Sequence, residues 1–238
     1  MIVSKKFIPS LFTILNAFCG FMSVINSSHA EYEQAVLFII YAAIFDVLDG
    51  MVARILNTSS DFGVELDSLS DVVSFGFAPS FLLYNFFFKD YNAIGIVVSS
   101  TVLAFGAIRL ARFNISLTGF TKDIFYGIPV PMAALVICSY VMFYHDSVFS
   151  KKASEIIIFV LTIGVSLLMV SNFRYPAMPS LNKQALKSKP WLTASIILGV
   201  LISVVTKGYA IFPITIIYIL YGIINTFIPQ KARPKIRH

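Results

Sequence analysis

Charged residues are scarce in this chain: they make up 13% of its 238 residues, whereas a soluble domain usually carries about 25%. Cysteine is almost missing, because Cys19 and Cys138 are the only two and both lie in apolar runs. The first shortage excludes an ordinary water-facing surface, and the second gives no basis for a disulfide framework. Hydrophobic residues, by contrast, reach 58%, with a mean hydropathy of +0.83. The composition therefore predicts an integral membrane protein.

Eight apolar stretches approach the roughly 20 residues that a helix needs to cross a bilayer. They are Pro9–Ser27, Ala35–Leu56, Asp67–Phe88, Ala93–Phe113, Pro129–Tyr144, Glu155–Val170, Trp191–Thr206 and Tyr209–Ile228. The connections between them are short and polar, and no linker divides the chain. We expect an all-α integral membrane protein of about eight transmembrane helices, formed as a single membrane domain over residues 1–238.

The basic residues predict the orientation, because Lys and Arg are enriched on the cytoplasmic side of membrane proteins. Placing the N-terminus in the cytoplasm puts 14 of the 18 Lys and Arg residues on that side. The sequence thus predicts a multi-pass protein of the cell membrane with both termini in the cytoplasm. The net charge of +6 follows from this distribution and does not indicate a nucleic-acid partner.

Four aspartates interrupt the second and third apolar stretches, where an ionised carboxylate is costly. Asp46 and Asp49 are three residues apart, and Asp67 and Asp71 are four apart, so each pair shares one face of a helix. The short loop between the helices places both pairs on the cytoplasmic side, where we expect the four carboxylates to converge. Two divalent cations would balance their charge, and oxygen-only ligands suit Mg²⁺ or Mn²⁺.

Small residues and one arginine are interleaved with these aspartates. Gly50, Ala53 and Gly63 would let a nucleotide approach the backbone, and Arg54 lies about one helical turn beyond Asp49, where it can meet phosphate oxygens. A single intramembrane aspartate is often structural, but four with this setting indicate a site. A cation-coupled transporter remains an alternative on these features alone, because transporters also bind ions with buried carboxylates.

Written as a pattern, the segment from Asp46 to Asp71 reads D-x2-D-G-x2-A-R-x8-G-x3-D-x3-D. This resembles the signature of the CDP-alcohol phosphotransferases at every fixed position. The first apolar stretch, with Thr13 and Asn16, is also similar to the first helix of that family. Three later segments resemble its bacterial and archaeal phosphatidylserine synthase branch: Arg109-Leu-Ala-Arg112-Phe-Asn114, Phe125-Tyr-Gly127-Ile-Pro129-Val-Pro131 and Ser171-Asn-Phe-Arg174-Tyr175-Pro176.

The resemblance implies an enzyme that transfers the phosphatidyl group of CDP-diacylglycerol to an alcohol and releases CMP. It implies that Asp46, Asp49 and Asp67 are metal ligands, and that Asp71 is the general base and a further ligand. It also implies a CDP-binding set, which consists of Gly50, Ala53, Arg54 and Gly63, with Thr13 and Asn16 reaching it from the first helix.

The acceptor alcohol calls for separate residues. Arg109 and Arg112 share a helix face and either bind a carboxylate or phosphate or simply anchor the helix on the cytoplasmic side. Asn114 is a candidate for contacting the amine of the acceptor or supporting an arginine. The later segments favour L-serine as the acceptor, with glycerol 3-phosphate, inositol phosphate and choline as alternatives. Membrane lipids and a second copy of the chain, in a homodimer, are the further partners that the resemblance implies.

Overall fold

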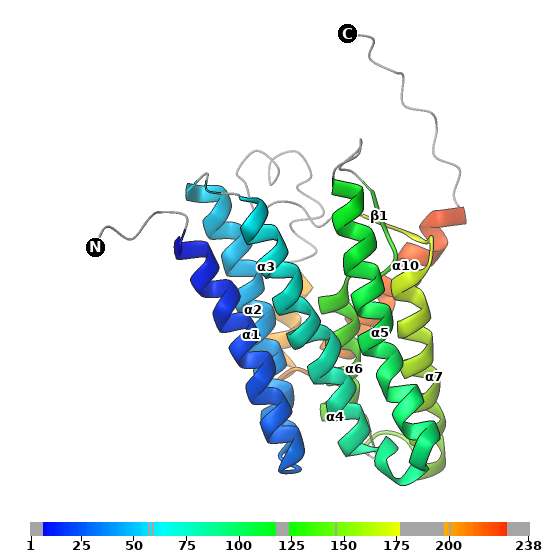
Figure 1. The fold of residues 1–238 in the computed structure, drawn as a ribbon. Helices are drawn as coiled ribbons and strands as arrows, with labels where there is room; N and C mark the ends of the chain where they lie inside the picture. Colours follow the sequence, from blue (N-terminus) through cyan, green and yellow to red (C-terminus); the bar gives the residue numbers. More distant parts are fainter. Residues whose placement is uncertain are drawn as a thin grey trace.

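The computed structural model describes residues 7–56, 58, 60–117, 124–145, 147–176, 198–199 and 201–227. Helices dominate this part of the chain and lie roughly side by side (Figure 1). They are α1 (Phe7–Ser28), α2 (Tyr32–Leu56), α3 (Asp61–Asp71), the π-helix η1 (Val72–Phe77), α4 (Ala78–Phe86), the 3₁₀ helix η2 (Phe88–Tyr91), α5 (Asn92–Leu117), α6 (Val130–Phe143), α7 (Lys151–Val170) and α10 (Ile211–Phe227).

Within the described residues, five helical stretches are long and apolar enough to cross a membrane, which agrees with the expected all-α membrane protein. They are Phe7–Ser28, Tyr32–Leu56, Asp61–Phe86, Phe88–Ile115 and Lys151–Val170. Two more apolar helices, α6 and α10, have 14 and 17 residues, and are short for a 30 Å hydrocarbon layer at about 1.5 Å per residue. Of the remaining expected span, Trp191–Thr206, only residues 198–199 and 201–206 are described.

The third expected span begins earlier in the structure than its apolar residues suggest. Ser60 caps α3 by accepting a hydrogen bond from the backbone N–H of Gly63 at 3.1 Å. This cap adds a polar first turn to the helix, which hydropathy alone does not detect. From Asp61 the chain stays helical through η1 to Phe86, so Asp67 and Asp71 lie within one continuous helical stretch.

The interior of the bundle holds small polar side chains as well as apolar ones. Ser23, Ser74, Thr162 and Ser166 are fully or almost fully buried alongside apolar residues such as Ile39. The outward faces carry large apolar side chains, more than half exposed at several positions; examples are Phe18, Phe21, Ile94 and Val97. Close packing through small residues inside and an apolar exterior are typical of helices in lipid.

A two-stranded antiparallel ribbon, which the sequence did not predict, joins the loop before α6 to the loop after α7. It pairs β1 (Ile124–Tyr126) with β2 (Arg174–Pro176). Gly127 follows β1 with a φ of +79°, and its N–H donates to the carbonyl of Phe173. Pro129 and Pro131 then stand at the start of α6, where proline suits the first turn. The ribbon lies towards the end of the bundle where α1 begins and α10 ends (Figure 1).

Candidate active site

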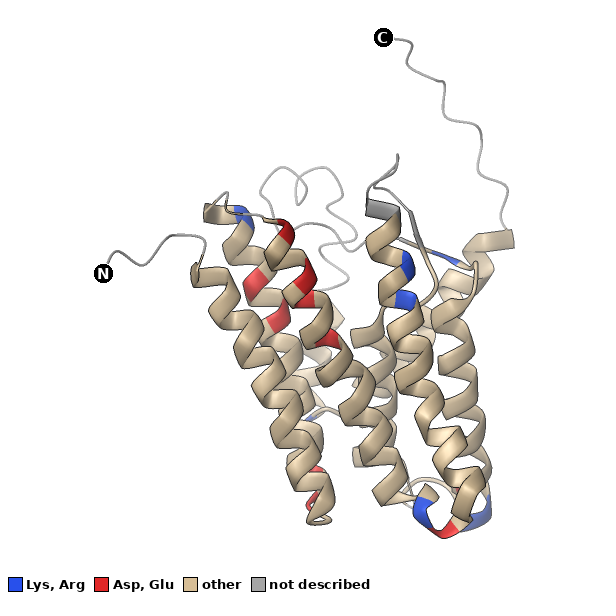
Figure 2. Cartoon of the chain, in the orientation of Figure 1, with Lys and Arg blue, Asp and Glu red and all other residues tan. Residues whose placement is uncertain are grey.

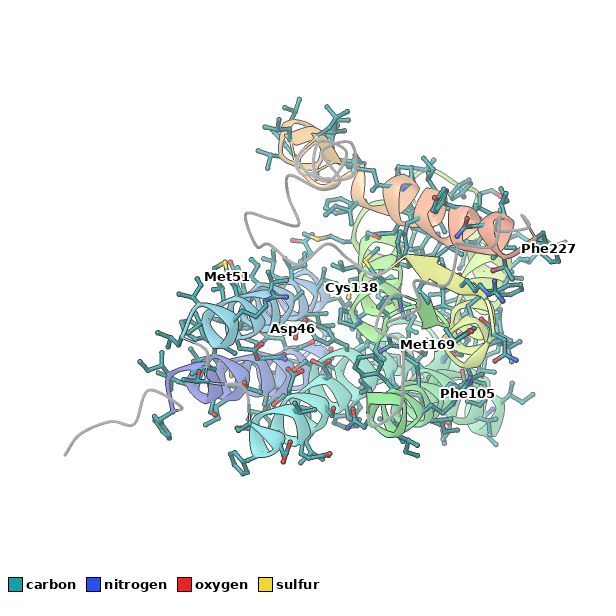
Figure 3. The ribbon with its side chains drawn as sticks, turned by 90° about the horizontal axis from the view of Figure 1, so that it is seen from above. Asp46, Met51, Phe105, Cys138, Met169 and Phe227 are labelled. Atoms are coloured by element: carbon teal, nitrogen blue, oxygen red, sulfur yellow. The ribbon has the colours of Figure 1, made fainter. Side chains whose placement is uncertain are left out.

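Three carboxylates meet between α2 and α3. Asp46 and Asp49 come from α2 and Asp67 from α3, and one oxygen of each lies within 4.8 Å of the others. Apart from those near the start of α2, the acidic residues of both helices gather towards one end of the bundle (Figure 2), and Asp46 lies on the part of α2 beside α1 (Figure 3). Within the described part of the chain, no Lys or Arg forms an ion pair with these three. Of the four carboxylates that the spacing predicted to converge, the structure brings these three within that distance.

The chemistry of this group suits a hard divalent cation. Its donor atoms are all carboxylate oxygens, the ligands that Mg²⁺ and Mn²⁺ prefer. The Oδ1 atom of Asp67 is buried and has no hydrogen-bond partner in the structure. Three negative charges held this close repel one another strongly in a medium of low dielectric constant. A bound cation would neutralise the repulsion and would give the Oδ1 atom of Asp67 a partner, so these residues fit a metal centre.

Asp71, the fourth aspartate, lies one turn beyond Asp67 and outside the three-carboxylate group. Its side chain is 7% exposed, and its Oδ1 accepts a hydrogen bond of 3.2 Å from Nδ2 of Asn16 on α1. The charges of the other three aspartates all act on it. It is the last residue of α3, and the π-helix η1 begins at the next residue. Single π-helical turns occur frequently at functional sites.

Close contact between α1 and η1 keeps Asn16 in place. The hydroxyl of Ser74, on η1, donates to the carbonyl of Asn16 at 2.8 Å. A Cβ atom on Gly20 would lie 2.6 Å from the Ser74 Oγ and 2.7 Å from its Cα, so only glycine allows this approach. The hydrogen bonds of Asn16 to Asp71 and to Ser74, together with the close approach that Gly20 allows, thus fix Asp71 relative to α1.

Thr13 and Asn16, predicted to reach the CDP site, both bond to aspartates. The Thr13 hydroxyl donates to Oδ2 of Asp49 at 2.9 Å, in the same way as Asn16 donates to Asp71. One turn of α1 separates the two donors, so α1 holds one carboxylate of each neighbouring helix. Their contact with CDP stays a prediction.

The other predicted CDP residues flank the carboxylates. A Cβ atom on Gly50 would lie 3.8 Å from Nη2 of Arg54, so the side chain of Arg54 passes beside the glycine. Arg54 itself is exposed, and Ala53 is half-buried. Gly63 is in the first turn of α3, where its N–H is bonded to Ser60. Space beside Gly50 and a free guanidinium suit a phosphate group, while Gly63 has a clear structural role as well.

The two arginines of α5 have opposite environments. Arg109 is 9% exposed, its guanidinium lies over the ring of Phe113 at 5.6 Å, and the charge of Asp71 acts on it. Arg112 is exposed and donates to the Val170 carbonyl at 2.6 Å and to Oδ1 of Asn172 at 3.2 Å. Only Arg109 therefore lies near the carboxylates. The acceptor-binding role predicted for Arg112 stays a prediction, and its observed partners are at the end of α7.

Asn114, the third predicted acceptor residue, bonds to α3. Its Nδ2 donates to the Ser68 hydroxyl at 3.0 Å and approaches Glu65 Oε2 at 3.5 Å. It therefore links α5 to the helix that carries Asp67 and Asp71, and its contact with an acceptor stays a prediction. Ser68 and Ser74 were not predicted from the sequence, because isolated serines in apolar helices carry no spacing signal.

Comparison with known proteins finds relatives along most of the chain. The model of the CDP-alcohol phosphatidyltransferase family matches residues 6–170. A CDP-diacylglycerol–serine O-phosphatidyltransferase of Helicobacter pylori (strain ATCC 700392 / 26695) is 37% identical over 217 residues, or 91% of this chain and 90% of the relative. The Bacillus subtilis (strain 168) protein of the same name is 35% identical over 186 residues, or 78% of this chain and 99% of the relative. An archaetidylserine synthase of Methanothermobacter thermautotrophicus is 39% identical over 171 residues, or 71% of this chain and 69% of the relative.

Proposed function

This chain belongs to the CDP-alcohol phosphatidyltransferase family, and on that premise we propose that it transfers the phosphatidyl group of CDP-diacylglycerol to L-serine. The products are phosphatidylserine and CMP. The observation that carries the proposal is the convergence of Asp46, Asp49 and Asp67, within the complete family pattern. Relatives named for the serine reaction, aligned over 90% and 99% of their own lengths, support serine as the acceptor.

In this proposal, Asp46, Asp49 and Asp67 hold divalent metal, Mg²⁺ or Mn²⁺. Two ions would balance the four carboxylates once Asp71 is included. Bound metal supplies positive charge that stabilises the charge developing on the pyrophosphate. The chain itself contributes orientation: Thr13 fixes Asp49 from α1, and the fixed carboxylates hold the reacting groups in one geometry.

Asp71 is the general base for the acceptor. It takes the proton from the serine hydroxyl, whose oxygen attacks the phosphorus that carries diacylglycerol. A new P–O bond forms, and the bond from that phosphorus to the bridging oxygen breaks. CMP leaves with that oxygen and the electron pair, and Asp71 later returns the proton to water. Asn16 holds the carboxylate of Asp71 by one oxygen, which leaves its other oxygen for the hydroxyl.

The two substrates approach from opposite sides of Asp71. We assign the CDP moiety to the α2 side, where Gly50 leaves space beside Arg54. We assign the acceptor to the α5 side, where Arg109 provides a buried cation near Asp71. A guanidinium binds a carboxylate in a fork of two hydrogen bonds, and serine is an alcohol that carries a carboxylate. The diacylglycerol chains remain in contact with membrane lipid.

The topology completes the proposal. We infer about eight transmembrane helices in a single domain over residues 1–238, with both termini and the active site on the cytoplasmic side of the cell membrane. The Lys and Arg distribution supports this orientation, as does the position of the start of α1 and the end of α10 at one end of the bundle (Figure 1). A homodimer is a further prediction, which chemical cross-linking in membranes tests.

CMP release by the purified full chain in detergent tests the function. The assay contains CDP-diacylglycerol and Mn²⁺ or Mg²⁺, with and without L-serine. We expect serine-dependent release that EDTA abolishes and added metal restores. Release with glycerol 3-phosphate, inositol phosphate or choline, but not with serine, would overturn the acceptor and keep the chemistry. No release with any alcohol, together with cation-coupled transport in liposomes, would overturn the enzyme.

A further inference from the structure

Arg109 is a buried cation that makes no ion pair or hydrogen bond with the described residues. It is 9% exposed, its Nε–H donor is buried without an acceptor, and its guanidinium lies over the ring of Phe113. A guanidinium carries five N–H donors, and burying it unpaired is unfavourable. Asp71 and Tyr218 are the groups whose charges act on it, and Tyr218 belongs to α10. An anionic ligand that pairs with Arg109 would therefore have Asp71 and Tyr218 as charged or polar neighbours.

Tyr175, on the ribbon strand β2, fixes the position of Tyr218. The two rings lie 5.5 Å apart with 34° between their planes. Tyr175 is 1% exposed, and its ring occupies the space that a side chain at position 222 would need, so Gly222 of α10 allows the contact. Its hydroxyl has no hydrogen-bond partner in the structure. Burial raises the pKa of Tyr175 to about 12, so the phenol stays neutral near pH 7.

Both tyrosines lie beyond the part of the chain that the family model matches. That match ends at residue 170, whereas β2 begins at Arg174 and α10 at Ile211. The aspartates and Arg109, in contrast, all lie inside it. The aspartates and the buried cation thus belong to the matched region, whereas Tyr218, whose charge acts on Arg109, belongs to the C-terminal part. A residue that selects among acceptor alcohols is well placed there.

We propose that Tyr218 of α10 contacts the ammonium group of the serine acceptor, with Tyr175 as a positioning residue behind it. This inference rests on the proposed function. Serine carries its carboxylate and ammonium on one carbon, one methylene away from the hydroxyl. With the hydroxyl at Asp71 and the carboxylate at Arg109, the ammonium needs a third group close to Arg109, and Tyr218 is a side chain whose charge acts on that arginine. A phenol oxygen accepts a hydrogen bond from an ammonium group, and the ring face attracts its charge.

Steady-state kinetics of Tyr218→Phe test this inference, with Tyr221→Phe as the matched control. Tyr221 lies on the same helix and is 55% exposed, so its hydroxyl is remote from the buried site. Because a hydrogen bond to a charged group is lost, we expect Tyr218→Phe to raise the serine KM on the order of 10-fold. The KM for CDP-diacylglycerol should not change in either variant, which also reports that the fold is intact.

Two results would overturn the inference: an unchanged serine KM in Tyr218→Phe, or an equal rise in the KM of both substrates. Tyr175→Phe provides a second measurement. As a positioning residue, it should raise the serine KM less than Tyr218→Phe does, and a larger rise would make Tyr175 the contact instead. Failure of the proposed function gives a different result, because the wild-type protein would then release no CMP with serine. Failure of this inference alone leaves serine-dependent CMP release by the wild-type protein intact and shows only in the KM values of the variants.

Discussion

The carboxylates of α2 and α3 and the arginine of α5 are held in different ways. Asp49 and Asp71 each accept a hydrogen bond from α1, which anchors them before any ligand is present. Arg109, on α5, is similarly buried and makes no hydrogen bond to the described residues. Groups that take part in the chemical step need to be held in fixed positions before the substrate binds. A group that binds a small charged acceptor can instead stay unpaired until the ligand supplies the opposite charge. This difference supports a role in the chemical step for the carboxylates of α2 and α3, and a role in acceptor binding for Arg109 of α5.

The largest effect that this comparison predicts is that of Asp71→Asn. The amide keeps the size of the side chain but cannot take a proton, so we expect turnover to fall by roughly 10²- to 10⁴-fold. Asp61→Asn is the matched control, because Asp61 begins the same helix and is exposed. Serine-dependent CMP release measures both variants at saturating substrate. Near-normal turnover in Asp71→Asn, in protein that still inserts and folds, would remove Asp71 as the base.

The next largest effect is expected for Arg109→Ala. Loss of a charge-assisted pair with the serine carboxylate should raise the serine KM by roughly 10- to 100-fold. The KM for CDP-diacylglycerol should stay within about twofold, because the CDP moiety is assigned to the α2 side. Equal rises in both constants would show that Arg109 supports the fold, and the division between the two sides would then be wrong.

A smaller effect is expected for Asn16→Ala, which tests whether α1 acts through the carboxylates. Substitution of a residue that orients a metal-site carboxylate typically costs on the order of 10-fold or more in metal affinity or activity. We expect the Mn²⁺ concentration for half-maximal activity to rise, with an unchanged serine KM. Asn26→Ala is the control, since the Asn26 amide bonds only within α1, to the carbonyl of Met22. A higher serine KM with unchanged metal dependence would move Asn16 to the acceptor side.

The same comparison shows how far the sequence alone could lead. The carboxylate side was predictable because its four residues lie within one short segment, where spacing on a helix determines which side chains share a face. The contacts that complete it were not, since Ser74 reaches Asn16 across 58 residues and the π-helix η1 leaves no mark in composition. Helix positions followed from hydropathy, but the capped polar start of α3 and the β1–β2 ribbon did not, because they depend on local hydrogen bonds. Tyr218 was not predictable either, because its effect on Arg109 depends on how helices far apart in the sequence pack.

Arg112→Ala should have the smallest effect on activity, and it gives the sharpest test of the contrast between the two arginines. Spacing places Arg112 on the same face as Arg109, but its guanidinium bonds to the Val170 carbonyl and to Asn172 at the end of α7. A cation at a helix C-terminus satisfies carbonyl groups that lack partners within the helix. We expect a loss of about 1 kcal/mol in the free energy of unfolding, which corresponds to a fall in Tm of about 2–4 °C. The serine KM should stay within about twofold, measured beside Arg109→Ala in the same detergent. If Arg112→Ala instead raises the serine KM as much as Arg109→Ala does at an unchanged Tm, both arginines bind the acceptor, and the partners of Arg112 at α7 describe only the ligand-free state.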